Sequence, residues 1–271
     1  MTVELVDVPW RDRIVTIEHR WIGPRAAPLV VFLHEGLGSQ AMWKDFPDRL
    51  CEAAGCSGLV YSRPGYGSST PRPGEERWGP DFMHRQAHEV LPALLQALDV
   101  DVDRRRPWLL GHSDGGSIAL LHAAKFVRSV AGVVVLAPHI LVEDISVDSI
   151  EQTRLAYLHT PLRERLARYH DDPDSAFWGW NRIWLDPAFR AWDIRREIAS
   201  IECPLLAIQG LDDEYGTLAQ VDGIAAALPH AELAKLPECG HSPHRDQPDR
   251  VLALASDFIR RHTHTTHGDK P

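Results

Sequence analysis

The residues best suited to nucleophilic chemistry lie in the stretch LLGHSDGGSIALL, at residues 109–121. A short apolar run there is followed by Ser113, between Gly111 and Gly115, and then by an apolar helix-like run. The spacing G-x-S-x-G at a change from strand to helix is typical of a sharp turn that holds a serine in a strained conformation. Glycines at both positions remove side chains that would collide in the turn. We therefore interpret Ser113 as a nucleophile exposed at the end of a strand.

A serine hydroxyl is a weak nucleophile, so this interpretation requires a histidine to accept its proton and a carboxylate to orient the histidine. Both follow in the chain. Asp212, Asp213 and Glu214 come directly after the apolar run CPLLAIQG, and His241 lies in a loop after the run AELAKLP. The chain thus presents its candidates in the order serine, acid, histidine.

The elements that must position these residues follow an alternating pattern. Short apolar runs bounded by turn residues occur at residues 14–22, 28–34, 57–62, 107–113, 129–138, 203–210 and 231–237. Helical patterns lie between most of them, at residues 41–55, 83–100, 115–127 and 218–229. Such alternation is typical of βαβ units around a buried sheet. We predict the α/β class, with a mostly parallel central sheet flanked by helices.

One region interrupts the alternation, because helical patterns at residues 143–158 and 161–170 appear without a strand-like run beside them. An insertion of this kind after a sheet strand fits a helical cap over the carboxyl ends of the strands. The predicted division is an α/β core at residues 1–138 and 201–262, a helical cap at residues 139–200, and a flexible polar tail at residues 263–271.

Composition narrows the classes of partner. The chain has 271 residues and a formal net charge of −9, from 29 basic and 38 acidic side chains. An acidic surface repels nucleic acid and anionic membranes, so we expect a small-molecule substrate, no nucleic acid and no membrane, and a monomer or homodimer. No segment is typical of a signal peptide or a membrane span, which favours a soluble, cytoplasmic protein. The cysteines have no paired metal-ligand spacing and are expected to be free thiols: Cys51, Cys56, Cys203 and Cys239.

Five motifs taken together resemble the α/β-hydrolase family. They are HEGLGS at residues 34–39, RPGYGSS at 63–69, GHSDGG at 111–116, GLDDEYGT at 210–217 and CGHSPH at 239–244. A single G-x-S-x-G is weakly specific, whereas five motifs in family order with the expected strands between them are specific. The resemblance covers nearly the whole chain. It implies an α/β-hydrolase fold with a helical cap and hydrolysis at a carbonyl group, with neither a cofactor nor a metal.

The resemblance also implies roles for individual residues. Ser113 is the nucleophile, His241 is the base and later the acid, and Asp213 is the carboxylate that orients the histidine. Asp213 is selected by the family pattern G-x-x-D in the loop after the strand. Some relatives carry the acid after another strand. Glu143 and Asp144 follow such a strand and are alternative acids, as is Asp212, which is adjacent to Asp213 and would serve if the turn is offset.

The implied oxyanion hole consists of the backbone N–H of Asp114 and one N–H from the loop after His34. Either Gly36 or Leu37 supplies the second donor, because Glu35 stands where many relatives have glycine directly after the histidine. Glu35 lies near the pocket, where it either repels anionic substrates or pairs with a neighbouring base. The side chain of Asp114 is predicted to cap the following helix.

Aromatic residues of the predicted cap are candidates for substrate binding. Trp178, Trp180 and Trp184 lie in one short segment, and the last two share a helix face because they are four residues apart. Indole rings turned toward the sheet would form an apolar roof suited to an aromatic or hydrophobic acyl group. The alternative is that these rings attach the cap to the core. His139 follows a strand end and is expected to face the pocket.

Three further residues near the motifs are expected to be structural. His112 precedes the serine and should point to the opposite side of the turn as a packing residue. His244 is expected on the surface of its loop. Arg63 is expected to support the turn in which it lies.

The function that these inferences favour is hydrolysis of a carboxylic ester through an acyl-enzyme, on a small hydrophobic or aromatic substrate. Two alternatives keep the same three residues: cleavage of a C–C bond in a product of aromatic ring fission, and opening of a lactone. A third alternative is a ligand sensor that retains the pocket without turnover. Fold-level analogy does not choose among the three hydrolytic reactions.

Overall fold

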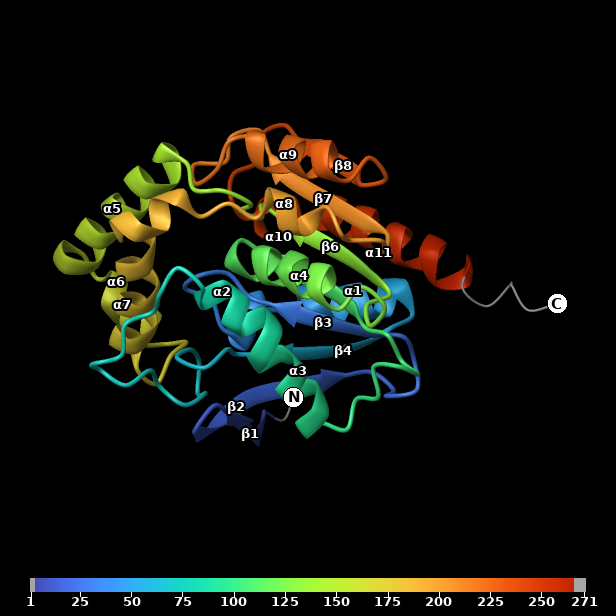
Figure 1. Ribbon diagram of the computed structural model, residues 1–271, viewed down its shortest axis with the longest axis horizontal. Coiled ribbons are helices and arrows are strands. Elements are labelled where there is room, and N and C mark those ends of the chain that lie inside the picture. The colour runs from blue at the N-terminus through green and yellow to red at the C-terminus, as the bar shows by residue number, and fades with distance from the viewer. Residues whose placement is uncertain (1–2, 266–271) are drawn as a thin grey trace.

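The computed structural model describes residues 3–265 and places an eight-stranded sheet between two layers of helices (Figure 1). The strand order is β1-β2-β4-β3-β5-β6-β7-β8. β1 and β2 pair antiparallel, as do β2 and β4, and every later pairing is parallel. The strands are β1 (Glu4–Trp10), β2 (Arg13–Ile22), β3 (Leu29–Leu33), β4 (Ser57–Tyr61), β5 (Trp108–His112), β6 (Gly132–Leu136), β7 (Leu205–Gly210) and β8 (Glu232–Leu236).

Helices occupy the intervals between most strands, as the alternating pattern predicts. They are α1 (Phe46–Ala54), α2 (Phe82–Arg85), α3 (Leu91–Ala97), α4 (Asp114–Lys125), α5 (Asp144–His159), α6 (Leu162–Leu166), α7 (Pro173–Trp184), α8 (Arg195–Ile198), α9 (Ala219–Ala227), α10 (Pro243–Asp246) and α11 (Pro248–Thr265). Short 3₁₀ turns lie at Gln40–Trp43 and Pro187–Ala191, and a turn of π-helix lies at Gln86–Val90.

The sheet is buried on both faces because its strands are apolar on both sides. In β3, Val30 and Phe32 pack with α1 and α11 on one face, whereas Val31 and Leu33 pack with α3 and α4 on the other. Alternation of this kind follows from the two-residue period of a strand, and apolar runs buried on both faces are typical of parallel sheets. The predicted α/β class is thereby confirmed.

Two local predictions were incomplete or wrong. β1 was not predicted, because its side chains are mostly exposed and it pairs only with β2 at the sheet edge. The pattern at residues 83–100 predicted a helix, and the structure has helical residues without a break from α2 through a π-helical turn to the end of α3. The predicted tail begins too early, since α11 continues through residues 263–265. Residues 266–271, the rest of that tail, lie outside the described part of the chain.

The predicted cap region contains helices and no named strand among its described residues. α5, α6 and α7 contact one another and lie together beyond the sheet (Figure 1). α8, by contrast, contacts α4 and α9, so the end of this region packs against the helical layer of the sheet. Whether residues 139–200 behave as a separate cap domain stays a prediction. None of the helices described is long and apolar enough to cross a membrane.

Candidate active site

Ser113 lies in the turn between β5 and α4, with the unusual backbone angles φ 53° and ψ −121°. A positive φ is rarely adopted by residues with a side chain, so this conformation is strained. The two glycines make the turn possible. A Cβ atom on Gly111 would overlap the carbonyl oxygen of Gly115, and one on Gly115 would overlap that of Leu33. Ser113 is therefore presented at the carboxyl end of β5, as the sequence pattern predicts.

Ser113, His241 and Asp213 form one chain of hydrogen bonds. Nε2 of His241 lies 2.9 Å from Oγ of Ser113, and Nδ1 lies 2.8 Å from Oδ1 of Asp213. When the imidazole of His241 is neutral, Nδ1 carries the proton and donates it in a hydrogen bond to the carboxylate of Asp213. Nε2 is then the acceptor for the serine hydroxyl. This tautomer is the one required to remove the serine proton.

Backbone and side-chain donors fix Asp213 in place. Its Oδ1 accepts from the N–H groups of Tyr215 at 2.9 Å and Gly216 at 3.2 Å, and its Oδ2 accepts from Gln209 at 3.1 Å. Burial alone would raise the pKa of Asp213, but the hydrogen bond and positive charge of His241, with the backbone donors, hold the pKa below its usual value. The carboxylate is thus ionised and oriented.

None of the three alternative acids is hydrogen-bonded to His241 in the described part of the structure. Asp212 is exposed, although it is adjacent to Asp213. Glu143 accepts hydrogen bonds from Thr217 and Gln220, and Asp144 forms an ion pair with Arg190. Of the candidate carboxylates, the structure brings Asp213 to His241.

A cleft of about 680 Å³ opens above Ser113 and His241. This volume is within the range of small-molecule sites in proteins. Most of the other predicted site residues line it, namely Glu35, Gly36, Leu37, Asp114, His139, Trp180 and Trp184. Tyr215, which sequence reasoning did not single out, also lines the cleft, and its ring centre lies 4.8 Å from that of His241.

Trp178 does not line this cleft, which corrects the prediction that it binds substrate. Its ring packs against Tyr157 and Phe177, and the guanidinium of Arg182 lies 5.4 Å from its centre. Residues two apart on a helix point in different directions, so Trp178 and Trp180 cannot share the same face of α7. Trp178 packs α7 against α5, whereas Trp180 and Trp184 face the cleft.

The two oxyanion-loop candidates both reach the cleft. Arg63 stabilises this loop, because its guanidinium donates a hydrogen bond to the carbonyl oxygen of Glu35 at 2.8 Å. This contact agrees with the structural role that we expected for Arg63. His170, which the sequence did not indicate, donates from Nε2 to the carbonyl oxygen of Leu37 at 3.0 Å. The indole of Trp180 lies so close to Gly36 that a Cβ there would overlap it.

Asp114 does not cap α4, contrary to the prediction. No side-chain cap bond is present at the start of α4, and Oδ1 of Asp114 instead accepts a hydrogen bond from the indole N–H of Trp184 at 3.1 Å. The carboxyl group is fully buried, and its Oδ2 has no hydrogen-bond partner among the described residues. Burial raises its pKa to about 6. Asp114 therefore places a weakly acidic group, rather than a helix cap, beside the serine.

Glu35 pairs with nearby bases, which is one of the two predicted alternatives. Its carboxylate lies 3.0 Å from Arg245 and 3.7 Å from Nδ1 of His112. Burial would raise the pKa of Glu35, but the neighbouring His112 and Arg245 hold it well below the usual value. Its negative charge is consequently compensated within the protein.

His112 and His244 are more closely tied to the site than expected. Nε2 of His112 donates to the carbonyl oxygen of His241 at 2.7 Å, so His112 fixes the histidine loop as well as packing beneath the turn. His244 is only 4% exposed, which corrects the prediction of a surface position. Its ring packs between Trp43 and Phe46, and burial lowers its pKa.

His139 faces the cleft as predicted. Its ring centre lies 5.6 Å from that of His241 and 4.8 Å from that of Trp184. Burial first, and the nearby His241 second, lower the pKa of His139 to about 3. It therefore stays neutral and does not add a positive charge next to His241. No cluster of three or more potential metal ligands occurs among the residues whose side chains are described.

The fold and the hydrogen-bonded chain of serine, histidine and aspartate are those of a hydrolase, and comparison with known proteins agrees. A sequence profile of the alpha/beta hydrolase family matches residues 30–254, most of the chain. The chain belongs to this family, and it is a hydrolase.

Individual relatives are more distant. Serine hydrolase BPHL from Homo sapiens is 26% identical over 214 residues, which cover 74% of this chain and 69% of the human protein. A 2-hydroxy-6-oxo-6-phenylhexa-2,4-dienoate hydrolase from Burkholderia cepacia is 23% identical to this chain. The matched region covers 85% of this chain and 87% of that hydrolase. An esterase of known structure from Thermogutta terrifontis superimposes with a TM-score of 0.73 at 18% identity, over 97% of this chain and 99% of the esterase. At that identity the likeness supports the fold alone.

Proposed function

We propose that this hydrolase cleaves a carboxylic ester of a small hydrophobic or aromatic substrate through an acyl-enzyme. The observation that carries the proposal is the hydrogen-bonded chain itself. A serine in a strained turn, a histidine at 2.9 Å and a buried carboxylate behind it meet at the floor of an open cleft. This arrangement generates a nucleophile at neutral pH without a metal ion.

In the first half of the reaction, Nε2 of His241 takes the proton of Ser113 as Oγ forms a bond to the carbonyl carbon of the ester. The carbonyl oxygen becomes negatively charged. The N–H of Asp114 binds it in this proposal, because the first residues of a helix have no intrahelical partner for their N–H groups. Gly36 or Leu37 supplies the second N–H. Collapse of the intermediate breaks the bond to the leaving oxygen, and His241 protonates the alcohol.

The second half repeats these steps with water as the nucleophile. His241 removes a proton from water as the oxygen attacks the acyl carbon. The bond between that carbon and Oγ of Ser113 then breaks, and the proton returns from His241 to the serine. Asp213 remains ionised throughout and stabilises the imidazolium that forms in each half.

The lining of the cleft supports the choice of substrate class. Trp180, Trp184 and Tyr215 supply aromatic surface around the reacting serine. Aromatic walls favour an apolar acyl or alkoxy group. Because Glu35 is paired with Arg245, we do not assign it a part in rejecting anionic substrates.

A competing substrate panel tests the proposal. Because the Burkholderia cepacia relative is named for a ring-fission product, the panel contains such a vinylogous diketone, an enol lactone and p-nitrophenyl butanoate. We expect the highest kcat/KM for the aryl ester. A preference of more than tenfold for the diketone would replace ester hydrolysis by C–C bond hydrolysis, and the same preference for the lactone would assign a lactonase.

A further inference from the structure

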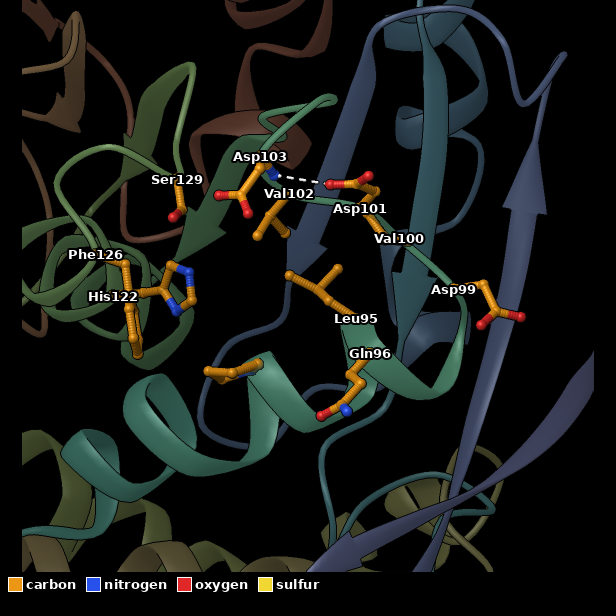
Figure 2. Close-up of a pocket in the computed structure, with 11 residues that line it drawn as sticks. Leu95, Gln96, Asp99, Val100, Asp101, Val102, Asp103, His122, Phe126 and Ser129 are labelled. Atoms are coloured by element: carbon orange, nitrogen blue, oxygen red, sulfur yellow. Dashed lines mark hydrogen bonds between the residues drawn. The ribbon is translucent and has the colours of Figure 1, made fainter.

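A second cavity, of about 490 Å³, lies away from the Ser113 cleft (Figure 2). It is formed by the end of α3, the segment that leads into β5, and the last turn of α4. This is the amino edge of the parallel strands, whereas Ser113 lies at the carboxyl end of β5. His122 in the cavity is nine residues beyond Ser113, or about 13 Å along α4. The cavity shares none of its lining residues with the Ser113 cleft.

The walls of this cavity are apolar. Leu95 from α3, Val100 and Val102 from the following segment, and Phe126 after α4 line it (Figure 2). Leu95 is buried, and the other three are half-buried because they border the opening. An apolar cavity of this size fits the body of a small organic molecule.

His122 supplies a hydrogen-bond acceptor inside the cavity. It is only 3% exposed, and its Nδ1 donates to the carbonyl oxygen of Ala87 at 2.7 Å. Nε2 is therefore the unprotonated nitrogen of the ring, and it has no hydrogen-bond partner among the described residues. Figure 2 shows the ring directed into the cavity. Burial lowers the pKa of His122 to about 4, so the ring stays neutral.

The opening of the cavity is negatively charged. Asp99, Asp101 and Asp103 lie along it and are exposed. Oδ1 of Asp101 accepts from the backbone N–H of Asp103 at 3.2 Å, which fixes the turn (Figure 2). Arg104 lies 3.5 Å from Asp101, but no lysine or arginine is among the described residues that line the cavity. The charge at the opening favours a cation.

We propose that this cavity is a binding site for an aromatic alkylamine that carries a hydroxyl group on its ring. The ring lies between the side chains of Leu95, Val102 and Phe126. The hydroxyl donates a hydrogen bond to Nε2 of His122, and the ammonium group lies at the aspartates of the opening. No residue of the Ser113 cleft takes part, so the site is independent of the proposed esterase activity.

Calorimetric titration of the full chain with tyramine tests the site, because tyramine carries both a phenol and an ammonium group. Two matched compounds each remove one feature: 2-phenylethylamine lacks the hydroxyl, and 4-hydroxyphenylacetate replaces the cation by an anion. We expect 2-phenylethylamine to bind about fivefold more weakly than tyramine, and 4-hydroxyphenylacetate at least tenfold more weakly. Equal affinity for the anion, or no binding of tyramine at millimolar concentration, would overturn the proposal.

Substitutions locate the binding. Val102→Trp fills the cavity from a half-buried position and should abolish tyramine binding while leaving ester turnover unchanged. The double variant Asp99→Asn/Asp103→Asn alters only exposed side chains and should weaken tyramine binding at least fivefold. Glu52→Gln is the control, because it removes an exposed carboxylate from α1 on the other face of the sheet. Binding that persists in Val102→Trp, or that weakens as much in Glu52→Gln as in the double variant, would rule out this cavity.

His122→Phe tests the acceptor separately. The substitution retains a ring in the helix but removes Nε2, so tyramine should bind no better than 2-phenylethylamine. Thermal unfolding of the variant shows whether the fold is intact. An unchanged preference for tyramine in a folded variant would contradict the role of His122.

Discussion

Two adjacent aspartates differ in what they contact. The carboxylate of Asp213 is bonded to His241, whereas that of Asp212 is exposed. Asp213→Asn should lower kcat by about 10⁴-fold, because an amide neither selects the required tautomer of His241 nor stabilises the imidazolium. Asp212→Asn is the matched control and should retain kcat within about twofold. Steady-state kinetics on one ester measure both. Similar losses in the two variants would remove Asp213 from its role.

Asp114 should make stability depend on pH. Its pKa is raised from 3.8 to about 6 by burial, so between these pH values the folded protein binds more protons than the unfolded chain. Its contribution to stability therefore falls as the pH rises from about 4 to about 6 and stays low above that. At 1.36 kcal/mol per pKa unit, the resulting loss in the free energy of unfolding amounts to about 3 kcal/mol.

Asp114→Asn removes this dependence while keeping an acceptor for the indole of Trp184. The melting temperature of the variant relative to the wild type should therefore be higher at pH 8 than at pH 4.5. Thermal unfolding at the two pH values measures this difference. A constant difference between variant and wild type would mean that Asp114 does not titrate in this range.

The turn between β5 and α4 depends on close approach of backbone atoms. Gly115→Ala would place a methyl group against the carbonyl oxygens of Leu33 and His34, and we expect it to lower the free energy of unfolding by about 3 kcal/mol or more. Gly74→Ala is the control, since nothing lies near its Cβ position and its φ is not positive. Urea denaturation measures both. An equally stable Gly115→Ala would show that the turn tolerates a side chain.

Helix α7 carries two tryptophans that differ in what they contact. Trp180 lines the Ser113 cleft, whereas Trp178 packs against Tyr157 and Phe177. Trp180→Phe should raise KM for an aryl ester about fivefold, because part of a contact made equally in ground and transition states is lost. Trp178→Phe should leave KM unchanged. The prediction fails if the two substitutions change KM to the same extent.

Strands whose residues are all apolar and buried were predictable from the sequence. An element with mostly exposed side chains, whose place depends on pairing with a neighbouring strand, was not. The apolar runs that became β3 to β7 are buried along their whole length, so hydrophobicity alone marked them. β1 was missed because its outward side chains carry no such signal. The helical pattern did not predict the π-helical turn that joins α2 to α3.

At the scale of the whole molecule, the site combines loops that follow β3, β5, β7 and β8 with helices inserted between β6 and β7. Motif order indicated which loops meet, because the carboxyl ends of parallel strands lie at one edge of a sheet. Contacts between those loops were not predictable. His244 is buried by Trp43, about two hundred residues earlier in the chain, and Asp114 is bonded to Trp184 rather than to its own helix.

The central claim is that Ser113 attacks the ester and is acylated. Stopped-flow hydrolysis of p-nitrophenyl butanoate, with intact-mass analysis of the quenched protein, tests it most directly. We predict that the wild type releases p-nitrophenolate and carries a butanoyl group on Ser113, and that Ser113→Ala loses both, with kcat reduced by about 10⁴-fold or more. Hydrolysis at the wild-type rate by Ser113→Ala would contradict the account.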